Sequence, residues 1–374
     1  TKHKKIERTM KKLILLTAIL LPALFTNAQI VNIPDANFKT ALVADTLINT
    51  NQDTEIQVSE AIAVNSINVL SFNISDLTGI EAFTNLTFLG CADNNLTTID
   101  VSSNINLTYL DCGYNQLTTL GIGNNISLDT LSCANNNIVT IDFSNNINLT
   151  LLWCFQNQLS NLDVSNNINL KYLYFSHNQL NSLDVSNNAN LLGLGCEYNL
   201  IDTLDLSNNL QLNALACRYN QIRVLDLSNN PVVELNCSNN QLSTLNVRNG
   251  ENTNCYVFNA LNNPNLYCIK VDDAIWSSSN WTDIDSQSYY SESCNSTGIN
   301  ENQVINLNVY PNPTTGIIRI EADGIEKIEI IDLHGKQIYG GNENEINLSL
   351  EPDGIYIIKV ITDLQTITQK LIKQ

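Results

Sequence analysis

Cysteine and histidine are the side chains that most often supply nucleophiles and metal ligands. The chain has 374 residues, among them ten cysteines and three histidines. Seven cysteines share one position of a repeated pattern, and Phe175 occupies that position once. These cysteines are Cys91, Cys112, Cys133, Cys154, Cys196, Cys217 and Cys237. Evenly spaced thiols could serve metal or disulfide chemistry, but a bulky ring in the same column favours buried, reduced cysteines that act as small hydrophobic residues.

Catalysis requires a base held beside a nucleophile, and we find no motif that would place such a pair. The histidines are His3, His177 and His334. His3 lies in residues 1–28 and His334 in residues 307–374, which are described below as a leader and a tail, so only His177 lies outside both. The sequence also shows no glycine-rich phosphate loop and no H-E-x-x-H or C-x-x-C metal pattern. We therefore expect no catalytic residues and no enzyme.

The net charge of −19 argues against nucleic acid as a partner, because phosphate binding needs clustered Lys and Arg.

One segment has the spacing of a cation site. Residues 49–60, NTNQDTEIQVSE, resemble the calcium loop of EF-hand proteins, which places oxygen ligands at positions 1, 3, 5, 7 and 12. Two positions depart from that pattern, since Asn49 replaces the leading Asp and Thr54 replaces the turn Gly. Calcium is the one cofactor that the sequence suggests, and an ordinary polar loop is the alternative. The candidate ligands are Asn49, Asn51, Asp53, Glu55 and Glu60.

A short repeat positions most of the other side chains. Its template is L-x-x-L-x-C-x-x-N-x-L-x-x-L-D-V-S-x-N-x-x, and the copies start at Leu86, Leu107, Leu128, Leu149, Leu170, Leu191, Leu212 and Val232. The starts are 21 residues apart (107 − 86), except for a last step of 20 (232 − 212). The alternation x-Leu-x-Cys-x predicts a strand with Leu and Cys pointing inward. One copy is too small for a core of its own, so the copies must stack. We expect a mostly β solenoid with a parallel sheet on the order of 40 Å long.

An asparagine follows each expected strand, where the chain turns inward: Asn94, Asn115, Asn136, Asn157, Asn178, Asn199, Asn220 and Asn240. A buried turn leaves backbone groups without water, and an Asn amide both donates and accepts. We expect a structural column, and a cost of about 1–3 kcal/mol for Asn157→Ala.

The second half of each copy alternates again, as in Leu162-Asp163-Val164-Ser165. This pattern predicts an extended return segment rather than a helix. Its acids would line the back of the solenoid, either as a solvated face or as a weak divalent-cation site. They are Asp100, Asp142, Asp163, Asp184, Asp205 and Asp226.

The copies resemble the cysteine-bearing subclass of bacterial internalin-type leucine-rich repeats. The resemblance rests on the L-x-x-L-x-C-x-x-N-x-L core and covers residues 86–250. It implies a solenoid whose strands line a concave face, and a role in adhesion or recognition at a cell surface.

The outward positions of two adjacent copies bring together Leu151, Trp153, Phe155, Tyr172 and Tyr174. An exposed apolar patch of this kind usually marks an interaction site, and Trp and Tyr are enriched at binding hot spots. The next copies place Gly193, Gly195, Ala214 and Ala216 beside these side chains. We expect a shallow depression there, rimmed by His177, Glu197 and Arg218, that holds a protein loop or a sugar ring. The alternative is that the aromatic residues merely cover the sheet.

The ends of the chain differ from the repeats. Residues 1–28 read as a signal peptide with an upstream extension before Met10. Residues 29–85 predict an N-terminal cap with a short helix and a degenerate first repeat, and residues 251–294 predict a C-terminal cap in which the periodicity fades. Cys268 and Cys294 leave the repeat spacing, so a disulfide between them is expected in an exported protein. Cys255 would then be a terminal member of the cysteine column, and residues 295–306 a polar linker.

Residues 307–374 contain several short alternating strands separated by turn signals, which predicts a small β-sandwich. This tail resembles the type A sorting domain of the type IX secretion system. The matching positions are Tyr310, Pro311, Asn312, Pro313, Gly316, Gly335, Gly354 and Tyr356. The resemblance implies contact with the secretion machinery, cleavage of the tail, and release or anchoring at the outer cell surface.

Together these features predict a secreted or cell-surface binding protein of the adhesin or scaffold type, with a protein or glycan ligand on its concave face. The alternative is a carbohydrate-capturing protein that assists surface enzymes. After residue 28 no apolar run is long enough to cross a bilayer, so we expect no transmembrane segment.

Overall fold

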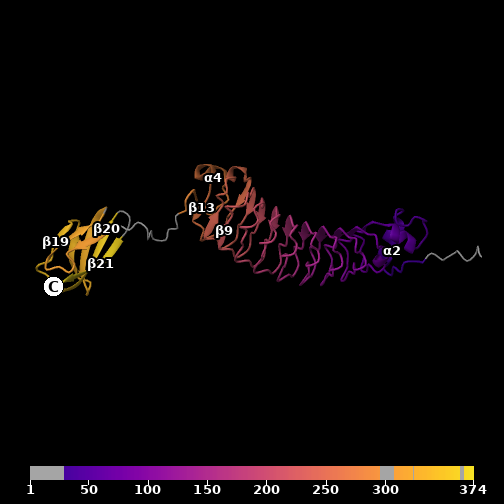
Figure 1. The fold of residues 1–374 in the computed structure, drawn as a ribbon, viewed down its shortest axis with the longest axis horizontal. Helices are drawn as coiled ribbons and strands as arrows, with labels where there is room; N and C mark the ends of the chain where they lie inside the picture. The colour runs from indigo at the N-terminus through magenta and orange to yellow at the C-terminus, as the bar shows by residue number, and fades with distance from the viewer. Residues whose placement is uncertain (1–28, 295–306, 323, 363–365) are drawn as a thin grey trace, which may run out of the picture. The chain divides into compact units, whose positions relative to one another are not determined.

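The structure, a computed structural model, describes residues 29–294, 307–322, 324–362 and 366–374. The chain divides into two compact units, and the division falls between Cys294 and Asn295 in the sequence (Figure 1). The expected signal peptide, residues 1–28, and the expected linker, residues 295–306, lie outside the described residues. No helix in the described ranges is long and apolar enough to cross a membrane.

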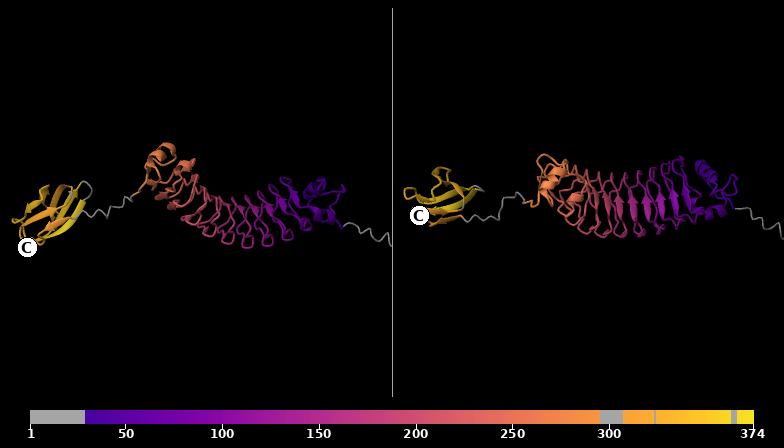
Figure 2. Two further views of the ribbon diagram at one scale, coloured as in Figure 1. Left: turned by 45° about the horizontal axis from the view of Figure 1, so that its top comes forward. Right: turned by 90° about the horizontal axis from the view of Figure 1, so that it is seen from above.

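A parallel sheet runs through the first unit, and each repeat contributes one strand to it. Within residues 29–294 the sheet has ten strands in the order β1-β2-β3-β4-β5-β6-β7-β8-β10-β12. Figure 2 shows the unit as a bowed stack, with this row of strands on its concave side. The prediction of a mostly β solenoid of stacked repeats is confirmed. The strands are β1 (Ser66–Asn68), β2 (Phe88–Gly90), β3 (Tyr109–Asp111), β4 (Thr130–Ser132), β5 (Leu151–Trp153), β6 (Tyr172–Tyr174), β7 (Gly193–Gly195), β8 (Ala214–Ala216), β10 (Glu234–Asn236) and β12 (Val257–Asn259).

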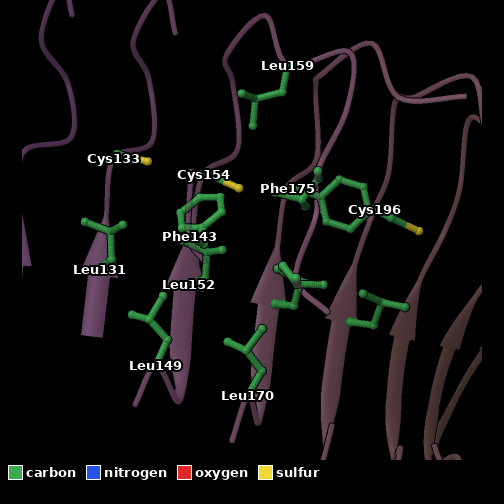
Figure 3. Packing of buried hydrophobic residues seen from close by; sticks show 14 of the residues in the cluster. Leu131, Cys133, Phe143, Leu149, Leu152, Cys154, Leu159, Leu170, Phe175 and Cys196 are labelled. Atoms are coloured by element: carbon green, nitrogen blue, oxygen red, sulfur yellow. The ribbon is translucent and has the colours of Figure 1, made fainter. Parts of the chain in front are cut away.

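Each rung, meaning one repeat of the stack, buries the same side chains against its neighbours (Figure 3). In the rung that carries β5, Leu149, Leu152 and Cys154 are fully buried. The column of thiols lies inside the core, and burial raises the pKa of Cys154 to about 12. Cys154 is unpaired, as are the six other cysteines of its column. These cysteines therefore act as reduced hydrophobic groups, as the sequence predicted.

The side chain of the asparagine after each strand bonds to backbone groups of its own rung and of the preceding rung. In the case of Asn157, Nδ2 donates to the carbonyl oxygens of Cys133 at 3.0 Å and of Cys154 at 3.2 Å. Its Oδ1 accepts from the backbone N–H of Ile138 at 3.0 Å. The expected structural column is present, and each amide ties consecutive rungs together.

A second buried asparagine column was not anticipated from the sequence. It lies at the end of each return segment, where Asn146 is fully buried. There Nδ2 of Asn146 donates to the carbonyl oxygens of Ile122 at 3.1 Å and of Asn125 at 2.9 Å. The members are Asn104, Asn125, Asn146, Asn167, Asn188, Asn209 and Asn230. Both edges of these seven rungs are therefore held by amide side chains.

The return segments along the back of the stack are extended, as expected, and their acids form tight local turns. Oδ1 of Asp163 accepts the backbone N–H of Ser165 at 3.0 Å, and hydrogen bonds from the side chain and the backbone of Ser165 lower the pKa of Asp163. Toward the C-terminal end of the unit, the return segments pair into a second parallel sheet, in the order β14-β13-β11-β9. Its strands are β9 (Val224–Asp226), β11 (Thr244–Asn246), β13 (Cys268–Lys270) and β14 (Tyr289–Ser291).

The sequence indicated that the periodicity fades after Val247, but the structure shows that it continues. Strand β12 pairs with β10 in register, with Phe258 opposite Leu235. Asn263 continues the first asparagine column, since its Oδ1 accepts from the N–H of Leu242 at 3.1 Å. This further rung escaped notice because its spacing is longer and because Ala260 takes the place of cysteine.

Cys255 occupies the column of the leading leucines in this rung, three residues before Phe258, and not the cysteine column. The expectation that Cys255 ends the cysteine column was therefore wrong.

The stack is closed by a 3-10 turn, η3 (Asn252–Asn254), and by α4 (Ala274–Asn280). Trp281 follows α4 and stacks on Phe258, with ring centroids 4.2 Å apart. The structure joins Cys268 and Cys294 in the expected disulfide.

The opposite end is covered by two helices, α2 (Ala36–Ala44) and α3 (Val58–Ala63), and by the 3-10 turn η2 (Ile80–Ala82). Asp35 caps α2 by accepting the backbone N–H groups of Asn37 and Phe38, each at 2.9 Å. The helix turns Phe38 and Leu42 into the core, where both are fully buried. A solenoid end would otherwise expose its apolar interior to water.

The second unit consists of two antiparallel sheets that share one core, as the expected sandwich requires. Within residues 307–322, 324–362 and 366–374 the orders are β15-β16-β19 and β18-β17-β20-β21. Isoleucines from both sheets, including Ile318 and Ile330, are fully buried between them. The strands are β15 (Asn308–Tyr310), β16 (Ile317–Glu321), β17 (Ile325–Asp332), β18 (Gln337–Gly341), β19 (Glu345–Asn347), β20 (Gly354–Thr362) and β21 (Thr366–Lys373).

Candidate functional site

The ten-stranded sheet presents an inner face, made of the side chains that point away from the core. On this face β5 and β6 are in register, so that Leu151 lies opposite Tyr172 and Trp153 opposite Tyr174. Trp153 is 36% exposed and Tyr172 is 38% exposed. Leu151, Phe155 and Tyr174 are half-buried. These five residues are hereafter the aromatic patch, and the parallel register brings them together.

The depression lies one rung further along than the sequence suggested. A Cβ atom added to Gly195 would lie 2.6 Å from Cδ1 of Tyr174, and one added to Gly193 would lie 3.0 Å from Cδ1 of Tyr172. The two tyrosine rings therefore lean over β7, and both glycines are buried beneath them. The missing Cβ atoms make this leaning possible, because any larger residue in β7 would push the rings away.

A hollow of about 160 Å³ opens beyond the leaning rings, over β8, β10 and β12. Ala214 and Ala216 form its floor between Tyr174 on one side and Val257 on the other. Its polar side chains are Glu234 and Asn236. Burial raises the pKa of Tyr174, and the neighbouring Tyr172 and the carboxylates of Glu234 and Glu197 raise it further. The ring of Tyr174 therefore lies in the negative field of two acids.

None of the predicted rim residues, His177, Glu197 and Arg218, lines the hollow. His177 instead belongs to a row of stacked rings beside the sheet. The ring of His177 stacks on Tyr198 with centroids 4.1 Å apart, and Tyr198 stacks on Tyr219 at 4.3 Å. All three residues have left-handed backbone conformations, with φ between 54° and 56°. Such conformations are costly for residues with large side chains. The stack places three rings in a row along the edge of the inner face.

Glu197 and Arg218 form an ion pair next to this row. Nε of Arg218 lies 3.4 Å from Oε1 of Glu197, and the guanidinium carbon lies 5.5 Å from the centre of the Tyr198 ring. The other carboxylate oxygen of Glu197 accepts the hydroxyl of Ser176. The guanidinium is thus held between a carboxylate and an aromatic face.

The loop at residues 49–60 uses its polar side chains to hold its own backbone. Asn49 is buried, and its Nδ2 donates to the carbonyl oxygen of Asp53 at 2.8 Å. Asp53 accepts the N–H of Glu55 at 2.7 Å. In turn, Glu55 pairs with Lys39 at 2.6 Å. Across the residues that the structure describes, no group of three or more His, Cys, Asp and Glu side chains has the arrangement of a metal site. Calcium binding by this loop stays a prediction.

Glu60 is the most heavily bonded carboxylate of that loop. Its Oε1 accepts the N–H groups of Thr50 at 2.8 Å and of Asn51 at 3.1 Å, and its Oε2 accepts the N–H of Gln57 at 3.0 Å. The last of these bonds belongs to a capping box at the start of α3. Burial alone would raise the pKa of Glu60, but these bonds favour the charged form and the net pKa is lowered.

We expect Glu60→Gln to reduce the free energy of unfolding by about 1–3 kcal/mol at pH 7, since buried donors lose a charged acceptor. The folded pKa of Glu60 lies below its ordinary value of 4.5. The contribution is therefore complete above that value and is lost as the pH falls through the folded pKa. Urea unfolding at pH 7 and at pH 3 measures this effect, and the gap between the two proteins should narrow at pH 3. Glu55→Gln is the control, because a half-exposed ion pair contributes about 0–1 kcal/mol.

The predicted sorting residues at 310–313 connect the first segment of the second unit to its last strand. Asn312 donates from Nδ2 to the carbonyl oxygen of Lys370 at 2.8 Å and accepts the N–H of Ile372 at 2.9 Å. The flanking prolines, Pro311 and Pro313, follow cis peptide bonds. Tyr310, at the end of β15, donates its hydroxyl to Glu321. The Tyr-Pro-Asn-Pro segment thus lies against β21.

Of the other predicted sorting positions, Gly316 is required by close packing and Gly335 by a turn. A Cβ atom on Gly316 would lie 2.4 Å from Oγ of Ser349 and 3.3 Å from its Cα atom. Gly335 has a φ of 82°, in the left-handed region that favours glycine. Gly354 opens β20, and the hydroxyl of Tyr356 donates to the carbonyl oxygen of Pro352 at 2.6 Å. These residues shape the sandwich itself.

Residues 308–374 match the protein family described as the secretion system C-terminal sorting domain. No curated protein matches the chain. The chain therefore combines a leucine-rich repeat scaffold with a secretion sorting domain, and that domain indicates a secreted or cell-surface protein.

Solved structures of bacterial repeat proteins are also similar to the chain. The functional domain of InlJ from Listeria monocytogenes, described as including a cysteine ladder, has a TM-score of 0.47 and 22% identity over 92% of this chain and 98% of that one. The internalin InlF from the same organism has a TM-score of 0.44 and 21% identity over 72% of this chain and 94% of that one. We draw the fold from the stacked repeats of this chain and not from these similarities, because their TM-scores are below 0.5.

Proposed function

We propose that residues 29–294 form a recognition module that binds a protein or glycan ligand on its inner face, outside the cell. One observation carries the proposal: the aromatic patch exposes Trp153 and Tyr172 on adjacent strands of the inner face, next to β7 and β8, which carry only glycine and alanine there. Large exposed aromatic residues supply contact area at a low cost in conformational entropy. A rigid stack of rungs holds them without movement on binding.

The second unit supplies delivery in this proposal. Its match to a secretion sorting domain supports export through the type IX system, followed by removal of both the leader and the tail. The recognition module would then remain at the cell surface or be released. Catalysis has no part in the proposal.

Carbohydrate capture is a second candidate function. The flat faces of Trp153, Tyr172 and Tyr174 are partly open to solvent, and such faces pack well against the apolar side of a sugar ring. The module would then hold a polysaccharide for surface enzymes. Retention on polysaccharide gels tests this candidate directly.

We expect the double substitution Trp153→Ala with Tyr174→Ala to weaken ligand binding about a hundredfold or more, since hot-spot aromatic residues each contribute about 2 kcal/mol. Arrays of proteins and glycans first identify a ligand of the whole chain, and surface plasmon resonance then measures its affinity for both proteins. Tyr267→Ala is the control, because Tyr267 is 58% exposed and lies outside the patch. Unchanged affinity in the double variant would place the binding site elsewhere.

A further inference from the structure

Glu234 stands at the rim of the hollow with an exposed side chain. One of its carboxylate oxygens accepts the hydroxyl of Tyr256. Among the ion pairs formed by residues in the described part of the chain, none includes Glu234. The hollow therefore offers a carboxylate whose charge is not neutralised by a basic side chain within that part.

The opposite wall and the floor of the hollow are suited to an apolar stem and a flat cationic group. The half-buried ring of Tyr174 faces the space above Ala214 and Ala216. The volume of about 160 Å³ is close to the roughly 150 Å³ that accommodates a single benzene ring. Aromatic faces attract cations to within about 6 Å of the ring centre. The hollow can thus take one side chain, and not a folded segment.

The same rungs already hold one basic group in this way. Arg218 lies between the carboxylate of Glu197, at 3.4 Å, and the ring of Tyr198, at 5.5 Å. That arrangement holds an arginine between an acid and a tyrosine ring. Glu234 and Tyr174 provide the acid and the ring again across the hollow, without an arginine of the chain between them in the described residues.

We propose that the hollow binds an arginine side chain of a basic segment in a protein ligand, with its guanidinium between Glu234 and Tyr174 and its stem on Ala214 and Ala216. This inference deepens the proposed function and rests on it. Arginine suits the site better than lysine, because its planar group both stacks on a ring and pairs with a carboxylate. The net charge of −19 would also draw a basic segment toward the module.

The test uses the full chain with its alanine methyl groups labelled with carbon-13 and, as probe, N-acetylarginine N-methylamide. We expect the methyl signals of Ala214 and Ala216 to shift on titration at millimolar concentrations. The matched neutral probe is the citrulline derivative, which keeps the shape but has no charge, and it should bind about tenfold more weakly or worse. Glu234→Gln should weaken arginine binding by a similar factor. Asp202→Asn, which removes an exposed acid elsewhere, should leave that binding unchanged.

Equal shifts with the arginine and citrulline probes would overturn the proposal, as would full arginine binding by Glu234→Gln. Shifts produced by methyl N-acetylglucosaminide but not by the arginine probe would overturn it as well, and would favour a sugar in the hollow. The proposed function fails separately. If Trp153→Ala with Tyr174→Ala keeps full affinity for a ligand found on the arrays, the recognition face is misplaced even where the arginine probe binds.

Discussion

Asn157→Ala should lower the free energy of unfolding by about 1–3 kcal/mol. The substitution leaves the buried N–H of Ile138 without the side-chain oxygen to which it donates. The carbonyl oxygen of Cys133 loses one donor but still accepts from Nδ2 of Asn136 at 3.1 Å. One buried polar group is therefore left without a partner, and the structure supports the cost that was expected from the sequence.

Urea unfolding followed by circular dichroism measures this loss. Hydrogen exchange should place the weakening at the rungs of β4, β5 and β6, since a stacked repeat depends on its nearest neighbours. Asn166→Ala is the matched control: Asn166 belongs to the same repeat, is exposed, and donates to Ser144 at 3.3 Å. A loss for Asn157→Ala no greater than that of the control would show that the column does not hold the rungs together.

Phe175→Ala should reduce the free energy of unfolding by about 3–5 kcal/mol, the usual cost of truncating a buried aromatic residue. Phe175 is fully buried and lies between Cys154 and Cys196 in the thiol column (Figure 3). The neighbouring rungs are fixed by their own hydrogen bonds to β6, so they cannot close over the space that the ring leaves. Part of the cost is therefore a persistent cavity.

Comparing Phe175→Ala with Phe175→Cys separates the cost of the cavity from the cost of removing apolar atoms from the core. This substitution makes the column uniform and should recover part of the loss, because a thiol fills part of the space. Tyr172→Ala, three residues earlier on the exposed side of β6, should cost much less. Differential scanning fluorimetry and urea unfolding measure all three proteins. A Phe175→Ala protein as stable as the native chain would mean that the rungs move together and fill the cavity.

The solenoid could be predicted because each rung repeats the same inward side chains. Eight aligned copies predict Leu152 and Cys154 inside and Trp153 outside, and the structure places them so. The further rung at β12 was missed because Phe258 and Ala260 replace Leu and Cys. The second asparagine column was also missed, since a pair such as Asn145-Asn146 is equally typical of a surface turn. Only the fold shows that Asn146 is buried.

The aromatic patch could be predicted from strand alternation, but the hollow could not. Alternation shows that Tyr174 leaves the sheet on the inner side, and it does not give the direction in which the ring then leans. The ring covers Gly195, so the open space moves to Ala214 and Ala216. Glu234 becomes a rim residue for that reason alone, and no pattern in the sequence indicates that position.

The buried thiols have a consequence for the life of the protein outside the cell. Thiolates are the reactive form of cysteine, and burial raises the pKa of Cys237 to about 12. While the rungs stay closed, oxidants cannot reach these sulfur atoms. Heating that opens the stack would free eight thiols at once, and neighbouring chains would then cross-link. Thermal unfolding of this protein should therefore be irreversible in air and reversible in the presence of a reductant. The lifetime of the folded protein then depends on the rate at which the first rung opens.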